Sequence, residues 1–198
     1  MGTTMNKRGF LALTTLGTVT PAALATTRAA AIEGPGLLTV SGAIGAGNRG
    51  PLDAALDQMM VKHKVAFERA HVFDATALKR LPAVRIRPTL EYDARPHALA
   101  GPLLSTVVEA AGVAPGGDVT LTLRAVDGYA VNLSLADARA YRMIVATAID
   151  GRPLALGGLG PQWAVYDADT LAPFKDKPLK ERFALCPWGL YHVDVKRG

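Results

Sequence analysis

Two Asp-Gly dipeptides constrain the fold of this chain more than any other feature. Asp127-Gly128 and Asp150-Gly151 each separate two runs of strand-forming residues, which are 119–126 with 129–133 and 143–149 with 153–156. Asp-Gly favours the two-residue turns whose twist matches antiparallel strands, so each dipeptide predicts a β-hairpin. Because the strands are joined by hairpins rather than by crossover helices, the sequence predicts an α+β fold with mixed or antiparallel sheets and a few short flanking helices.

Three helices are predicted between the strands. Leu52–Lys64 carries apolar residues at i, i+3, i+4, i+7 and i+8, which places them on one helical face. Asp74 is a good N-cap for a short helix over Ala75–Leu81, and Leu103–Ala111 is helical after Gly101-Pro102, which opens it. The remaining predicted strands or extended segments are Leu37–Ile44, Val65–Phe73, Val84–Arg87, Leu90–Tyr92, Trp163–Tyr166 and Leu190–Val195, the last alternating Leu190, His192 and Asp194 against Tyr191, Val193 and Val195.

The N-terminus has the pattern of an export signal. Lys7-Arg8 precedes the apolar stretch Gly9–Leu24, and no acidic residue occurs before Glu33. Cleavage sites of the A-x-A type end at Ala25 and at Ala31, and we favour Ala31 because the first strand begins soon after it.

We therefore expect residues 1–31 to be a signal peptide and residues 32–198 to form one periplasmic domain, which is not an integral membrane protein once processed. Asn6–Leu11 is also a degenerate twin-arginine pattern, so general secretion and twin-arginine export both remain open.

The charge and the cysteine content exclude two classes of protein. The full chain has a formal charge of +5, but loss of Lys7, Arg8 and Arg28 with the signal leaves 19 basic against 17 acidic residues, a charge of +2. Without a clustered basic face we expect no nucleic-acid partner. Cys186 is the single cysteine, so an internal disulfide is excluded.

The candidate catalytic and metal-binding motifs of the sequence are better explained by other roles. Gly45–Gly50 matches G-x-G-x-x-G, but hairpins follow it, so a glycine-rich surface turn explains it better than a dinucleotide site. The four histidines lack metal-ligand spacing, and Cys186 before Pro187-Trp188 has the context of a buried, inert thiol rather than of a nucleophile. We expect no metal and no catalytic residue.

Four blocks in the second half of the chain carry a resemblance to a known family. They are Ala100–Ser105, Leu123–Tyr129, Gly158–Trp163 and Cys186–Leu190. In this order and spacing the chain resembles the molybdopterin-binding domain of the sulfite oxidase fold, in its small, exported, single-domain form. Further matching features are Phe73-Asp74, Leu81-Pro82 and the Gly160-Pro161 loop.

The resemblance implies a pterin or molybdopterin-like ligand, which is a flat, polar heterocycle. Such a ligand needs an aromatic wall, backbone groups along its edge, and an Arg or a carboxylate for its pyrimidine part. The expected cofactor-binding residues are Arg85, Arg87, Glu91, Tyr92, Asp127, Tyr129, Gly160, Pro161, Trp163 and Trp188.

The chain also departs from the family pattern. Glu91-Tyr92 stands where many short members have Pro-Trp, and Gln162-Trp163 stands where they have an Arg after the Gly-Pro loop. The metal-binding cysteine of the enzymes would fall near Arg87–Leu90, where there is no thiol, and Cys186 is far along the chain. We therefore expect pterin binding without molybdenum.

Three functions remain open at this stage. The favoured one is an exported, non-catalytic pterin-binding protein that acts through a partner, such as the periplasmic domain of a membrane signalling protein. The alternatives are a molybdopterin-dependent oxidoreductase and a structural or assembly factor without a ligand.

Overall fold

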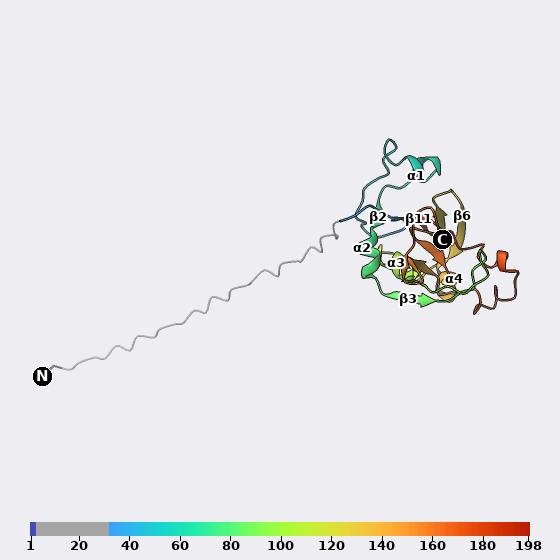
Figure 1. The fold of residues 1–198 in the computed structure, drawn as a ribbon. Helices are drawn as coiled ribbons and strands as arrows, with labels where there is room; N and C mark the ends of the chain where they lie inside the picture. The colour runs from blue at the N-terminus through green and yellow to red at the C-terminus, as the bar shows by residue number, and fades with distance from the viewer. Residues whose placement is uncertain (3–31) are drawn as a thin grey trace.

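The computed structural model describes residues 1–2 and 32–198 (Figure 1). The predicted signal peptide falls almost entirely on residues 3–31, outside the described part of the chain. No helix within the described residues has the length and apolar character needed to cross a membrane.

The largest sheet has five strands and joins the beginning of the domain to its end. Its order is β2-β1-β11-β5-β6, in which β1 and β11 are parallel and all other neighbours are antiparallel. The strands are β1 (Leu38–Gly42), β2 (Ala70–Phe73), β5 (Val119–Ala125), β6 (Ala130–Ser134) and β11 (Leu190–Arg197).

Two smaller sheets and a few short helices complete the fold. The four-stranded sheet has the order β3-β4-β8-β9, and β10 pairs with β7. These strands are β3 (Ala83–Ile86), β4 (Leu99–Pro102), β7 (Ile144–Ala146), β8 (Ala148–Ile149), β9 (Arg152–Pro153) and β10 (Trp163–Val165). The helices are α1 (Gln58–Lys62), α2 (Ala75–Arg80), α3 (Leu104–Ala110), α4 (Leu135–Ala140) and the 3-10 helix η1 (Leu179–Glu181). This confirms the predicted α+β class with mixed sheets, and the arrangement is compatible with the sulfite oxidase-type fold.

Both predicted hairpins form. In the β5–β6 turn the Asp127 carboxylate accepts a hydrogen bond from the Tyr129 N–H at 2.9 Å, and the Ala125 N–H donates to the Tyr129 carbonyl at 2.8 Å. Asp150-Gly151 joins β8 to β9. The predicted N-cap is also confirmed, because the Asp74 carboxylate accepts from the Ala77 N–H at 2.7 Å.

The long helix predicted over residues 52–64 is wrong. Only α1 is helical there, and the Asp53 carboxylate accepts hydrogen bonds from the N–H groups of Ala55 and Leu56 at 2.8 and 3.1 Å. Those bonds stabilise a turn in place of the first helical turn, because an Asp side chain competes with the backbone for its donors. Leu56, predicted to face the core, is 82% exposed.

Two local predictions in the middle of the chain are also corrected. Glu91 and Tyr92 form a turn rather than an extended segment, closed by a hydrogen bond from the Ala94 N–H to the Leu90 carbonyl at 3.0 Å. Gly101 and Pro102 end β4 instead of opening the helix. A Cβ on Gly101 would lie 1.9 Å from the Val145 carbonyl oxygen, so only glycine permits this approach of β4 to β7.

The last strand does not alternate simply as predicted. Its pairing with β5 shifts between Leu190 and His192, which inserts Tyr191 as an extra residue. A bulge of this kind breaks the period of two. As a result Leu190 joins Val193 in the main core, while Tyr191 packs in a second cluster with Met60 and Val65.

The two faces of the five-stranded sheet differ in chemistry. One face carries Leu38, Val40 and Leu121 and packs into the main core. The other carries buried polar side chains, Thr39, Ser41 and His192. The segment that contains α1 extends over the sheet end at the top of Figure 1, and its Met60 and Val65 contact Tyr191.

Candidate functional site

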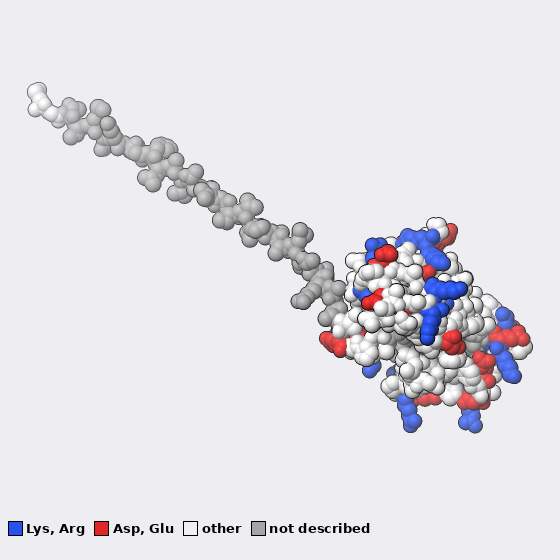
Figure 2. Space-filling view, turned by 90° about the horizontal axis from the view of Figure 1, so that it is seen from above, with Lys and Arg blue, Asp and Glu red and all other residues white. Residues whose placement is uncertain are grey.

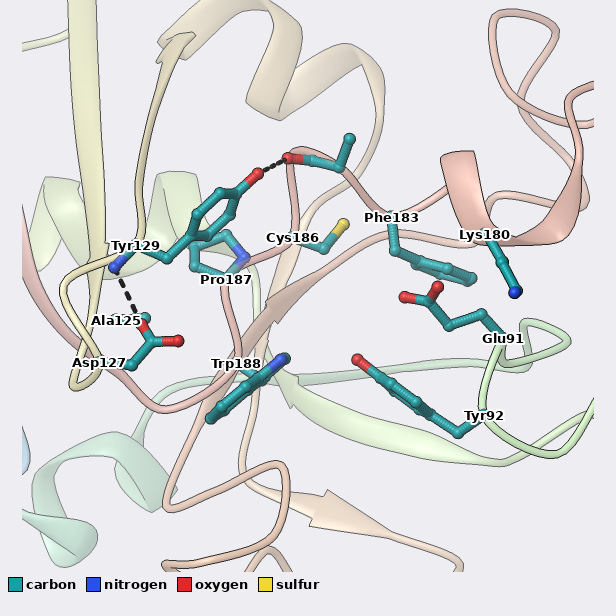
Figure 3. A pocket seen from close by; sticks show the side chains of 11 residues that line it. Glu91, Tyr92, Ala125, Asp127, Tyr129, Lys180, Phe183, Cys186, Pro187 and Trp188 are labelled. Carbon is teal, nitrogen blue, oxygen red and sulfur yellow. Dashed lines mark hydrogen bonds between the residues drawn. The ribbon is translucent and has the colours of Figure 1, made fainter.

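Three segments that are distant in the sequence meet at one pocket. They are the turn after β3, the β5–β6 hairpin, and the approach to β11 from η1 onward (Figure 3). The cavity has a volume of about 310 Å³. Its lining, which we call the aromatic pocket, consists of Glu91, Tyr92, Ala125, Asp127, Tyr129, Lys180, Phe183, Ala184, Cys186, Pro187 and Trp188.

The aromatic pocket collects the exposed aromatic side chains of the domain. Tyr92 is 55% exposed, Tyr129 49% and Trp188 37%, and among the described residues these are the large aromatics on the exposed surface. In Figure 3 the hydroxyl of Tyr92 points toward the Trp188 side of the pocket. Leaving three rings in water is unfavourable, so their convergence on one cavity is typical of a ligand site.

Hydrogen bonds hold two walls of this pocket in place. The Tyr129 hydroxyl donates to the Ala184 carbonyl at 2.6 Å, which ties the β5–β6 hairpin to the segment before β11 (Figure 3). The buried Trp163 indole N–H donates to the Cys186 carbonyl at 2.8 Å, and the Ala164 N–H donates to the Pro187 carbonyl at 3.2 Å. These two hydrogen bonds from β10 therefore hold the backbone that leads directly into Trp188.

The polar groups of the pocket are two carboxylates and one amine. Glu91 lies on the same turn as Tyr92, Asp127 lies at the hairpin, and Lys180 comes from η1. Partial burial raises the pKa of Tyr92, and the nearby Glu91 carboxylate raises it further. Tyr92 is therefore a neutral hydrogen-bonding ring at neutral pH, beside the Glu91 carboxylate.

Cys186 lies at the pocket although it is far along the chain from Glu91. Its side chain is 4% exposed, and burial raises the pKa of its thiol to about 12. Cys186 and Glu91, which is next to the family's cysteine position at residues 87–90, line the same cavity. The thiol stays protonated at neutral pH, as a buried, unreactive cysteine does.

The structure distributes the ten predicted cofactor-binding residues over three places. Five line the aromatic pocket, namely Glu91, Tyr92, Asp127, Tyr129 and Trp188. Arg85 and Arg87 line a separate cavity of about 450 Å³ that also contains Arg142 and Asp167.

The other three lie beneath the pocket or beside it, outside its lining. Trp163 is 1% exposed and supports the Cys186 carbonyl. Gly160 and Pro161, joined by a cis peptide bond, pack against the end of β9, where a Cβ on Gly160 would meet the Leu154 carbonyl carbon at 2.6 Å.

Sequence reasoning did not include six of the lining residues. They are Ala125, Lys180, Phe183, Ala184, Cys186 and Pro187. Four of them, within residues 183–187, precede Trp188 closely in the sequence, so the position of that tryptophan is the signal that could have found them. Lys180 carries no such signal, because only the fold of the loop with η1 brings it to the pocket.

Surface charge and metal-ligating side chains also bear on which ligands the domain could bind. Acidic and basic side chains are interspersed on the face seen in Figure 2. Within residues 1–2 and 32–198, no three His, Cys, Asp or Glu side chains lie together in a group that could hold a metal ion.

No protein-family model and no curated protein matches this sequence. Among solved structures, the chain is similar to the sulfane dehydrogenase SoxCD from Paracoccus pantotrophus, with a TM-score of 0.52 and 13% sequence identity. The match covers 80% of this chain but 37% of that chain. At this identity the likeness extends to the fold alone.

Proposed function

We propose that the aromatic pocket binds a pterin or a similar flat, N–H-bearing heterocycle. The observation that carries the proposal is the convergence of Tyr92, Tyr129 and Trp188, the exposed aromatics of the described domain, on one cavity. Aromatic faces are the natural partners of a planar heterocycle, because stacked or tilted rings gain about 0.5–1.5 kcal/mol beyond the burial of area.

The dimensions and polar groups of the pocket fit such a ligand. A cavity of about 310 Å³ is at the lower end of small-molecule sites, which span about 300–1,000 Å³. The amino-pyrimidine edge of a pterin presents N–H donors, and the carboxylates of Glu91 and Asp127 are acceptors for them. In this proposal Glu91 or Asp127 pairs with the polar edge of the ligand. The sequence predicted Arg85 or Arg87 in this role, but both arginines line a different cavity.

The same residues do not fit a molybdenum ion. In the family that the chain resembles a cysteine thiolate holds the metal, whereas Cys186, the one thiol of this chain, is 4% exposed and the pocket lining adds no histidine to it. We expect elemental analysis of the protein from its native compartment to find far less than one molybdenum per chain. A value near one molybdenum per chain would show that Cys186 or another group ligates the metal.

The proposal includes a non-catalytic role after export. The lining of the aromatic pocket contains no histidine and no activated nucleophile, so its chemistry supports recognition rather than bond-making. The protein would then act in the periplasm by presenting its ligand-dependent surface to a partner, such as the periplasmic domain of a membrane signalling protein.

Calorimetric titration of the purified protein with biopterin tests the binding proposal. We expect saturable 1:1 binding that Tyr92→Ala weakens by about threefold to tenfold, since it removes one aromatic face. Leu56→Ala is the matched control, because Leu56 is also exposed and lies outside the pocket. Absence of saturable binding, or equal effects of the two substitutions, would favour a structural role without a ligand.

A further inference from the structure

A second cavity lies on the polar face of the five-stranded sheet. Its volume is about 230 Å³, and the end of the α1 segment closes one side of it. We call it the cationic cavity, and its lining is Lys64, Val65, Ala66, Thr122, Arg124, His192, Asp194 and Lys196. It shares no lining residue with the aromatic pocket.

Strand register brings the polar residues of this cavity together. His192 on β11 pairs directly with Arg124 on β5, and the next pair on the same face is Asp194 with Thr122. Arg124 and Ala125 are consecutive, so their side chains point to opposite faces of the sheet. Ala125 lines the aromatic pocket and Arg124 the cationic cavity, which places the two cavities on opposite sides of β5.

His192 is the buried centre of the cavity. Its ring is 2% exposed and stacks on Phe67, with ring centroids 6.4 Å apart and an interplanar angle of 21°. Its Nε2 lies 2.8 Å from the Ser41 hydroxyl, whereas the Asp194 carboxylate is 3.4 Å from that hydroxyl. The Ser41 hydroxyl has one proton: when it donates to Asp194, Nε2 donates to Ser41, and when it donates to Nε2, the ring proton is on Nδ1.

Two buried nitrogens of the cavity have no protein partner. They are Arg124 Nε, which is always a donor, and His192 Nδ1, which is a donor when Ser41 donates to Nε2. Leaving a buried polar group unpaired costs about 1–3 kcal/mol, more for a charged one, so native proteins rarely keep two of them side by side without a ligand. The Thr122 hydroxyl donates to Asn132 at 2.8 Å and accepts from neither of these nitrogens.

The charge of the lining selects the ligand. Three cations, Lys64, Arg124 and Lys196, face one carboxylate, that of Asp194, which lies 3.8 Å from the Lys196 amine. With neutral His192 the lining carries two excess positive charges. A compact dianion with several acceptor oxygens matches this charge, the unpaired Arg124 Nε–H and the Nδ1-protonated tautomer of His192.

We propose that the cationic cavity binds a phosphate-type oxyanion, either inorganic phosphate or the phosphate group of a monoester. Arg124 Nε is its buried donor, His192 Nδ1 is a second donor in the tautomer that carries the proton there, and the exposed amines of Lys64 and Lys196 complete the charge. This site is independent of the proposed pterin site, since the two sites lie on opposite faces of β5.

Calorimetric titration at low ionic strength tests the proposal, with inorganic phosphate in one arm and phenyl phosphate in the other. We expect saturable 1:1 binding in at least one arm and no heat of binding with sodium chloride at the same ionic strength. Tighter binding of phenyl phosphate would identify a monoester as the ligand, and tighter binding of phosphate would identify the free ion. Absence of saturable binding in both arms at millimolar ligand would overturn the proposal.

Three variants distinguish a specific phosphate site from general attraction of phosphate to the positive charge of the protein. Arg124→Gln removes a buried charged donor and should weaken phosphate binding at least about tenfold. Arg152→Gln makes the same change of net charge at an exposed position on β9, outside the cavity, and should leave binding within about twofold. Equal weakening by both variants would show that only net charge matters, and would contradict the proposed site.

Lys64→Asn keeps the test decisive if Arg124→Gln does not fold. Lys64 is exposed and has a φ of 57°, a conformation that asparagine adopts more readily than most residues. We expect this variant to fold like the wild type and to weaken phosphate binding by about twofold to fivefold. Unchanged phosphate affinity in the folded Lys64→Asn variant would remove the cavity as the binding site.

Discussion

The aromatic pocket and the cationic cavity both involve β5 and β11, but they lie at different parts of these two strands. The aromatic pocket lies where β5 and β11 leave the sheet, and turns and loops provide nearly all of its lining. The cationic cavity lies on the strands themselves, where cross-strand register places His192 beside Arg124. The first has exposed rings and carboxylates, and the second has a buried histidine and excess positive charge. One sheet can therefore carry two sites of different chemistry because consecutive residues face opposite sides.

The largest expected difference between the two regions is their response to acid. Burial, and then the Arg124 cation, lower the pKa of His192 from 6.5 to about 4. Between these values the unfolded chain binds a proton that the folded chain does not, so the free energy of unfolding falls as the pH falls from 6.5 to 4. A shift of this size corresponds to a loss on the order of 3 kcal/mol from His192.

Denaturant unfolding of the wild type and of His192→Gln at several pH values measures this loss. The wild type should lose more stability than the variant between pH 6.5 and 4, since acid effects of Asp74 and the other carboxylates are common to both. Parallel pH profiles for the two proteins would show that His192 does not hold the neutral, buried state described here.

The next largest effect is expected at the aromatic pocket. Trp188→Ala removes the largest exposed ring and should weaken biopterin binding by about tenfold to a hundredfold, the sum of lost area and lost ring contact. The same variant should leave phosphate binding within about twofold, because Trp188 does not line the cationic cavity. A loss of both affinities would show that the two cavities are coupled, contrary to their placement on opposite faces.

These two regions also differ in how far the sequence could predict them. The hairpin at Asp127-Gly128 and the tryptophan before the last strand are local features, so half of the ten expected site residues lie at the aromatic pocket. The cationic cavity depends on the register of β5 against β11 and on the bulge at Tyr191, which no local pattern encodes.

The errors in the fold have a similar origin. The predicted helix over residues 52–64 failed because the Asp53 carboxylate binds two backbone donors that a helix would have to leave to water or to a cap. Arg85 and Arg87 were expected at the pterin because such a ligand needs an Arg or a carboxylate for its pyrimidine part, yet both line a cavity separate from the aromatic pocket.

The smallest effect concerns the hydrogen bond that closes the aromatic pocket. Tyr129→Phe keeps the ring but loses the bond to the Ala184 carbonyl, at a cost of about 1 kcal/mol. We expect biopterin affinity to fall by less than about fivefold, which calorimetry can measure beside Trp188→Ala. A loss as large as that of Trp188→Ala would mean that the hydroxyl, and not the ring, contacts the ligand.

The most direct test of the central claim, that the aromatic pocket is a pterin site, uses the two tryptophans of the chain. In a ¹⁵N-labelled protein each indole N–H gives one resonance, that of the 37% exposed Trp188 and that of the 1% exposed Trp163, which donates to Cys186. On titration with biopterin the Trp188 resonance should move and saturate at one ligand per chain, and the Trp163 resonance should move less. If neither indole resonance moves at millimolar biopterin, the aromatic pocket is not a pterin site.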